Sequence, residues 1–105
     1  MGVTIYAKHS KDYDMPYWHF YELMNDIASF AHKIPEAILF SEPPDHNGKL
    51  SYKECRELLQ EIGEMPDNGK LYGYIGKETR NCLTITLFKD VLKNCISHRC
   101  NLYWS

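Results

Sequence analysis

The stretch from residue 45 to residue 54 constrains the fold most, because it carries signals for a tight turn followed at once by a helix. Asp45-His-Asn-Gly48 has the residue types of a tight turn, in which Gly48 can take the positive φ that other residues avoid. Ser51 is a typical N-cap, and Glu54 three residues later completes a capping box. The sequence therefore predicts a turn over 45–48 and a helix that begins after its cap at residue 51.

The same residues have the spacing of the later part of a calcium-binding EF-hand loop. With Gly48 at the glycine position of that loop, Asp45, Asn47 and Glu54 stand where three of its oxygen ligands are needed. The position of the first ligand is Pro43, which has no side-chain oxygen, and the Pro-Pro pair there prevents a helix from entering the loop. Because capping alone accounts for these residue types, we expect no metal site; if a metal binds, Asp45, Asn47 and Glu54 are its expected ligands.

Length and composition indicate one domain over residues 1–105, with 44% hydrophobic residues to form a modest core. The formal net charge of -2 provides no electrostatic basis for binding nucleic acid or an anionic membrane. The sequence has no apolar run long enough to cross a bilayer, and its N-terminus lacks the pattern of a signal peptide. We therefore expect a cytoplasmic protein.

Four cysteines, Cys55, Cys82, Cys95 and Cys100, are then expected to be reduced thiols. Cys55 and Cys95 fall at apolar positions of helical patterns, where a thiol behaves as a small hydrophobic group. The spacing of Cys95, His98 and Cys100 matches no closed zinc motif, so packing is the preferred interpretation and no cofactor is expected.

Alternation of apolar and polar residues predicts a strand at each end of the chain. Val3, Ile5 and Ala7 form one face of a strand over residues 3–8. Residues 101–104 are predicted to form a short strand that pairs with it. Residues 9–15 are polar and turn-like, and the glycine-punctuated segment 65–80 is predicted to be a loop or a hairpin.

Helical spacing of apolar residues predicts two clear helices. The first runs from residue 18 to about residue 32, and its apolar positions are Phe20, Leu23, Met24, Ile27, Phe30 and Ala31. The second runs from residue 51 to about residue 64, and its buried stripe consists of Tyr52, Cys55, Leu58, Leu59 and Ile62.

The segment from residue 81 to residue 97 contains two periods. Leu83, Ile85 and Leu87 alternate as in a strand, whereas Phe88, Val91, Leu92 and Cys95 follow helical spacing. We predict a helix from about Thr79, with a strand as the alternative for residues 81–87. These segments predict an α+β fold in which about three helices pack with a small antiparallel sheet that includes the N- and C-terminal strands.

The order of these elements resembles a loose group of uncharacterised small proteins of phages and bacteria. The resemblance rests on the Asp12-Tyr-Asp-Met-Pro-Tyr-Trp-His-Phe20 stretch, on the turn and helix start over residues 45–55, and on the final Asn101-Leu-Tyr-Trp104. In that group a Ser-Asp-Cys-Asp-Gly-Glu-Leu-like turn precedes a Pro-Glu-Glu-Cys-like helix start. The chain departs from the group at Pro43-Pro44 and in its long 65–80 segment. The resemblance implies an origin in a phage or mobile element.

Two groups of residues are candidates for binding a partner. Four carboxylates lie within one sector of the predicted second helix and could meet a basic surface, and these are Glu54, Glu57, Glu61 and Glu64. Tyr13 and Tyr17 lie between the first strand and the first helix and are difficult to assign to a core. Tyrosines of this kind suit protein interfaces, because they bury a large area and keep a hydrogen-bonding end.

Catalytic signals are weak, and we expect a protein that is not an enzyme. The histidines are scattered, and no nucleophile has a base beside it in the sequence. His19 and Glu22, three residues apart, could form an acid–base pair, although such pairs are usually solvated.

We therefore expect a small protein-binding module, phage-encoded, that inhibits a bacterial defence system in the manner of an anti-CRISPR protein by covering a surface of a host or bacterial protein. Two alternatives stay open, namely a protein that binds a metal or small ligand with the 45–54 loop, and a small enzyme without a recognisable motif. Direct binding to nucleic acid or to a membrane is not expected, and a homodimer is left open.

Overall fold

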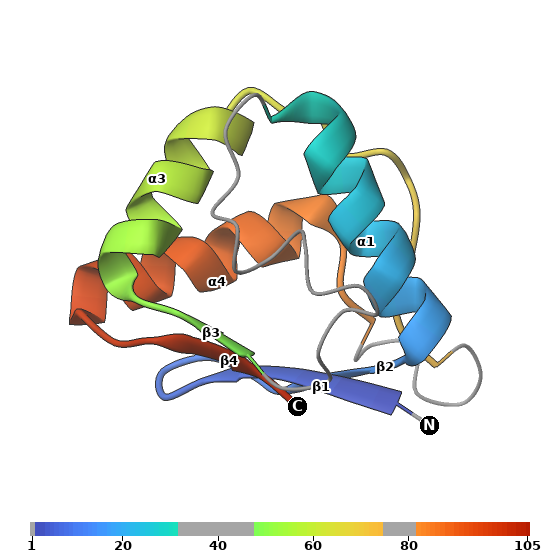
Figure 1. Cartoon of the computed structure of the whole chain (residues 1–105), viewed down its shortest axis with the longest axis horizontal. Helices are drawn as coiled ribbons and strands as arrows, with labels where there is room; N and C mark the ends of the chain where they lie inside the picture. The colour runs from blue at the N-terminus through green and yellow to red at the C-terminus, as the bar shows by residue number, and fades with distance from the viewer. Residues whose placement is uncertain (1, 32–47, 75–81) are drawn as a thin grey trace.

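The computed structural model describes residues 2–31, 48–74 and 82–105 (Figure 1). Over these residues the elements are β1 (Gly2–Ala7), β2 (Tyr13–Pro16), α1 (Tyr17–Phe30), β3 (Gly48–Leu50), α3 (Tyr52–Ile62), α4 (Ile85–His98) and β4 (Leu102–Trp104). The four strands form an antiparallel sheet in the order β2-β1-β4-β3, and the three helices lie on one face of it (Figure 1). The predicted α+β class is confirmed, including the N- and C-terminal strands.

The two ends of the chain pair with each other as predicted. β1 and β4 are antiparallel neighbours with Ile5 opposite Trp104 and Ala7 opposite Leu102. The backbones of Thr4 and Ser105 exchange two further hydrogen bonds of 2.8 and 3.0 Å. Val3, Ile5 and Ala7 of β1 are buried, as are Leu102 and Trp104 of β4, which is what the period-2 pattern predicts.

β2 was not predicted from the sequence, because residues 9–15 resemble a polar turn. Its residues pair with β1, with Met15 opposite Val3 and Tyr13 opposite Ile5. The expectation that Tyr13 is difficult to place in a core is wrong, since only 6% of the residue is exposed. Tyr13 and Met15 alternate with exposed aspartates, and four residues are too few for that alternation to stand out in the sequence.

β3 corrects the role expected for Gly48. Gly48 does not have the positive φ of a turn residue; it is a strand residue paired with Trp104 of β4. A Cβ built on Gly48 would collide with the six-membered ring of the Trp104 indole and would lie 2.8 Å from its Nε1 atom. Glycine is therefore required there by close approach of an aromatic ring, rather than by a turn. Residues 45–47 lie outside the described residues.

The capping box of α3 is present as predicted. The Glu54 N–H donates to Ser51 Oγ over 3.2 Å, and the Ser51 N–H donates to Glu54 Oε1 over 3.0 Å. The helix ends at Ile62, two residues earlier than expected. Of the predicted stripe, Cys55, Leu58 and Ile62 are buried, whereas Tyr52 and Leu59 are half-buried.

α4 begins at Ile85, so the prediction of a helix from about Thr79 is wrong; Thr79 itself lies outside the described residues. Thr84 is the N-cap, and its Oγ1 accepts a hydrogen bond of 3.1 Å from the Leu87 N–H. Leu83 forms an isolated antiparallel bridge with Tyr72, through two backbone hydrogen bonds of 2.8 Å. The strand alternative for residues 81–87 is therefore also wrong from residue 85 on, because Ile85 and Leu87 belong to α4 and Leu83 makes only this single bridge.

α1 runs from Tyr17 to Phe30 rather than from residue 18 to about residue 32. Its core positions are as predicted, with Phe20, Leu23, Met24 and Ile27 buried. The predicted stripe is wrong at its C-terminal end, because Phe30 is exposed. Among the described residues there is no helix with the length and apolar character of a membrane span.

Candidate functional site

The predicted acidic face of α3 is smaller in the structure than in the sequence. Glu54 is used in the capping box, and Glu64 lies beyond the end of the helix. Glu57 is exposed and Glu61 is half-buried. The carboxylates on the helix surface outside the capping box are therefore two rather than the four of the predicted face.

The predicted tyrosine pair is not an exposed pair either. Tyr13 belongs to the core, and burial, followed by the negative charge of Asp90, raises its pKa. Tyr17 is half-buried and packs against the core. Both tyrosines support the sheet–helix junction, and Tyr13 offers no free surface to a partner.

Large exposed side chains instead gather on α1 and on residues 71–74. Trp18 is 66% exposed and Tyr21, one turn further along α1, is also exposed. Leu71 and Tyr74 are exposed on the neighbouring segment, with Tyr74 at 54%. Trp18 and Tyr21 fall outside the apolar stripe of α1. Their position on the helix relative to that stripe was the signal in the sequence that could have identified them as exposed aromatic residues.

A polar network fastens residues 67–74 to α1. The Lys70 Nζ contacts carboxylate oxygens of Glu22 at 2.9 Å and of Asp26 at 3.1 Å. The Tyr72 hydroxyl donates to Asp26 Oδ2 over 2.5 Å and accepts a hydrogen bond of 2.9 Å from the Asn68 side chain. We call these five residues the clamp.

Charge and burial in the clamp shift two pKa values. The hydrogen bonds to Glu22 and Asp26 raise the pKa of Lys70. Burial, followed by the hydrogen bond to the Asp26 carboxylate, raises the pKa of Tyr72 to about 12. The Tyr72 ring is almost completely buried, so its hydroxyl serves as an internal donor to Asp26.

His19 connects the exposed Trp18 to the same segment. Its Nδ1 accepts a hydrogen bond of 3.0 Å from the Gly73 N–H. The Trp18 and His19 rings meet edge to face, with centroids 6.0 Å apart. The turn of α1 that presents Trp18 is thus anchored directly to the backbone of the neighbouring segment.

Side chains within the 67–70 turn hold its shape. The Gly69 N–H donates to Asp67 Oδ1 and the Lys70 N–H donates to Asn68 Oδ1, over 2.9 and 3.0 Å. Gly69 has a φ of 75°, which glycine takes without steric cost. Asp67 Oδ2 also accepts a hydrogen bond of 2.9 Å from the Thr86 hydroxyl, and these bonds, first that from Gly69, lower the pKa of Asp67. The turn is thereby tied to the start of α4.

The polar side chains of this region bond to one another or to the neighbouring backbone. His19 bonds to Gly73 and Glu22 bonds to Lys70, so the predicted acid–base pair has its members on different partners. Lys70 and Tyr72 both bond to Asp26. These contacts use the polar groups to position a chain segment.

Metal-binding residues are not brought together in the described part of the chain. Over residues 2–31, 48–74 and 82–105, no set of three or more His, Cys, Asp or Glu side chains is arranged to hold an ion. Of the ligands expected if a metal binds, Glu54 is used by the Ser51 N–H, and Asp45 and Asn47 lie outside the described residues. A metal site at residues 45–54 therefore stays an alternative that the described residues do not test.

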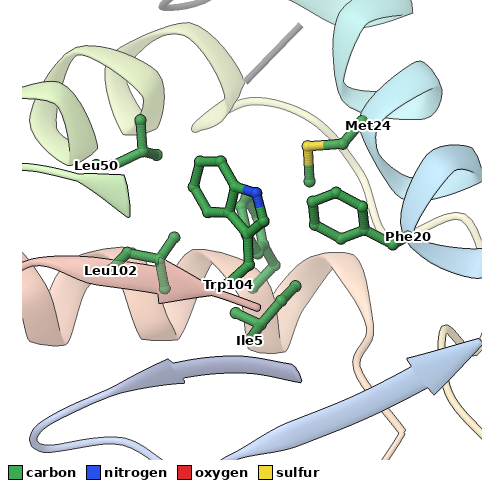
Figure 2. Close-up of a pocket in the computed structure, with 7 residues that line it drawn as sticks. Ile5, Phe20, Met24, Leu50, Leu102 and Trp104 are labelled. Carbon is green, nitrogen blue, oxygen red and sulfur yellow. The ribbon is translucent and has the colours of Figure 1, made fainter. Parts of the chain in front are cut away.

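A small apolar cavity lies between the sheet and the helices. Figure 2 shows the Trp104 indole between the leucine side chains of β3 and β4 and the Phe20 ring of α1. The lining residues are Ile5, Phe20, Met24, Leu50, Phe88, Leu102 and Trp104. The cavity measures about 10 Å³, the size needed for one water, and these side chains give such a water too few polar partners. It is a packing gap in the core.

Comparison with protein-family models, with curated proteins and with solved structures produced no match to this chain.

Proposed function

We propose that this protein is a binding module for another protein, and that its contact surface consists of Trp18, Tyr21, Leu71 and Tyr74. The observation that carries the proposal is the exposure of Trp18, two thirds of which faces solvent on a helix whose opposite side is core. A large aromatic side chain that stays exposed does not contribute the free energy that its burial would add to the stability of the fold. Tryptophan and tyrosine are also the residues that most often dominate the binding energy at interfaces.

The clamp supports this proposal because it orders the surface before a partner arrives. A flexible aromatic side chain on a mobile loop loses entropy on binding, and this loss weakens the complex. Here, Gly73 and Lys70 tie the loop to α1 on both sides of Leu71. Glu22 and Lys70 lie beside the aromatic residues as charged groups of the rim, which affect association rate more than affinity.

The mode of action that fits such a surface is occlusion, in which the module covers a surface that its partner needs for another contact. The narrower prediction, that the partner belongs to a bacterial defence system, rests on the sequence resemblance and stays a prediction. The contribution of the acidic residues to partner binding also stays a prediction, and it now concerns Glu57 and Glu61 on α3.

A site-specific crosslinking experiment tests the proposal. A photoreactive amino acid replaces Trp18 in one variant and Lys93, an exposed residue of α4, in a control variant. We expect one protein from bacterial lysate to crosslink through position 18 only. With that partner purified, Trp18→Ala should weaken binding by about 2 kcal/mol or more, mostly through faster dissociation, while Lys93→Ala should leave it unchanged. Equal crosslinking at both positions, or full affinity in Trp18→Ala, would contradict the proposal.

The metal-site alternative and the homodimer are each tested by a separate experiment. Calorimetry with millimolar calcium tests the alternative of a metal site at residues 45–54, and heat from a saturable site would support it. Sedimentation at two protein concentrations tests the homodimer, since self-association through Trp18 would be abolished by Trp18→Ala.

A further inference from the structure

Three of the four cysteines form a chain of thiols where α3, α4 and the start of β4 meet. Cys55 is on α3, Cys95 is on α4 and Cys100 lies between α4 and β4. Side-chain hydrogen bonding couples the Cys95 thiol to the thiols of both Cys55 and Cys100. The Leu102 N–H also bonds to the Cys55 sulfur. All three thiols are free, and Cys95 contacts both of the others.

The backbone fixes the proximity of Cys95 and Cys100. Arg99 takes the left-handed conformation with a φ of 51°, which turns the chain back over the last turn of α4. The Arg99 N–H donates to Ile96 O over 3.4 Å, and the Cys100 N–H donates to Cys95 O over 3.0 Å. These are the two bonds of a Schellman motif, in which the side chains at the positions of Cys95 and Cys100 commonly contact each other.

Exposure differs along the thiol chain. Cys55 and Cys95 are completely buried, whereas Cys100 is half-buried. A reagent from solution therefore reaches Cys100 before the other two, and Cys95 lies directly behind it. Cys82 is buried elsewhere, with its thiol bonded to the Tyr74 carbonyl, and is a natural control.

We propose that Cys100 and Cys95 form a redox-active pair, in which a small-molecule disulfide modifies Cys100 and Cys95 resolves the adduct into a Cys95–Cys100 disulfide. The deprotonated sulfur of Cys100 attacks one sulfur of oxidised glutathione; a mixed disulfide forms, and one glutathione leaves as a thiolate. Cys95 then attacks the Cys100 sulfur, the mixed disulfide breaks, and the second glutathione leaves. Two protein thiols are oxidised and one small-molecule disulfide is reduced to two thiols.

Cys55 is a positioning residue that holds the Cys95 thiol, and in the second step the proton of Cys95 leaves with the departing glutathione. The hydrogen bond from Cys95 lowers the pKa of Cys55, and the same bond is the main cause of the raised pKa of Cys95. Burial raises the pKa of Cys100, so its thiolate is scarce at neutral pH and the first step accelerates as the pH rises.

The test treats the folded protein with oxidised glutathione at pH 7 and pH 9, quenches with acid and maps cysteine peptides by mass spectrometry. We expect a glutathione adduct at Cys100 to appear first and a Cys95–Cys100 disulfide to follow, both faster at pH 9. Cys95→Ser should accumulate the Cys100 adduct, and Cys100→Ser should react at least about tenfold more slowly than wild type. Cys82→Ser should behave as wild type, and Cys55→Ser should slow the second step only.

Several outcomes overturn the proposal. They are a first adduct at Cys55 or Cys82, a first disulfide between Cys55 and Cys95, and a protein that stays reduced at pH 9 while its urea-unfolded form reacts. If Cys95→Ser does not fold, the order of adduct and disulfide in the wild-type time course decides the same question. Persistence of a Cys100 adduct in the wild type, without a disulfide, also overturns it.

Discussion

The contact between α3 and α4 and the contact between α1 and residues 67–74 are built in different ways. The residues that α3 and α4 bury are apolar side chains or thiols, such as Leu58, Leu92 and Cys95. α1 meets residues 67–74 through hydrogen bonds and ion pairs of Lys70 and Tyr72. The stability of the first contact depends on the apolar area that it buries, which changes little when the side chains shift slightly. The stability of the second depends on the geometry of its hydrogen bonds, which weaken when the donor and the acceptor are misaligned. The comparison predicts large losses from deletions in the first contact and local, pH-sensitive losses in the second.

The largest effect is expected from shortening a side chain in the α3–α4 layer. Leu58 is completely buried, so Leu58→Ala should reduce the free energy of unfolding by about 2–5 kcal/mol through lost burial and a cavity. Its neighbour Leu59 is half-buried, and Leu59→Ala should cost clearly less. Urea denaturation followed by circular dichroism measures both. Equal losses would mean that the assigned helix phase is wrong.

The clamp should respond to Tyr72→Phe with a smaller and more local loss. Removing the hydroxyl deletes hydrogen bonds to Asp26 and Asn68, and a bond to a carboxylate contributes about 1.5–3 kcal/mol at most. Hydrogen exchange should become faster at the Tyr72 and Leu83 amides, which form the bridge to the start of α4, while α3 amides keep their protection. Uniform loss of protection would show that the clamp is not a local unit.

The pH dependence of stability distinguishes the two contacts further. The folded-state pKa of Tyr72, about 12, lies above the ordinary value of 10.0, so folding favours the protonated hydroxyl. This contribution is complete below pH 10 and is lost as the pH rises towards 12. Wild type should therefore lose more stability than Tyr72→Phe over that range. Parallel curves for the two proteins would refute a stabilising Tyr72 hydroxyl.

Ser51→Ala should cost about 1 kcal/mol, because it removes the side-chain acceptor of the Glu54 N–H at the start of α3. The loss should be the same with calcium and with a chelator. A thermal melt in both conditions measures it, and a chelator that lowers the midpoint of wild type by several degrees would indicate that Glu54 is a metal ligand after all.

The smallest effect should be a gain. Arg99 is held at a φ of 51°, where a Cβ is unfavourable, so Arg99→Gly should stabilise the protein by about 0.5–1 kcal/mol. The matched change Arg56→Gly, inside α3, should destabilise by about 1 kcal/mol, because glycine weakens a helix interior. Urea titration measures the change in the free energy of unfolding for both variants. Changes of the same sign in the two variants would contradict this prediction.

Local patterns in the sequence were sufficient for the parts of the fold that depend on neighbours along the chain. The alternation in β1 predicted its buried face, and the Ser51–Glu54 spacing predicted the capping box, because both depend on residues two to three positions apart. The strand at 101–104 and its pairing with β1 were also predicted correctly.

Only the tertiary structure decided the rest. β2 owes its strand conformation to pairing with β1, and Gly48 is required by an indole that is 56 positions away in the sequence, at Trp104. The bonds of Lys70 and Tyr72 to Asp26 and the His19–Gly73 bond join residues 44 to 54 positions apart. They brace the surface on which Trp18 stands, whereas the pairing of β2 with β1 places Tyr13 in the core. A hydrogen bond between two distant residues produces no repeating pattern of apolar residues in either segment of the sequence. The sequence therefore determined the helices and strands that depend on local patterns, and the tertiary structure determined the exposed surface around Trp18.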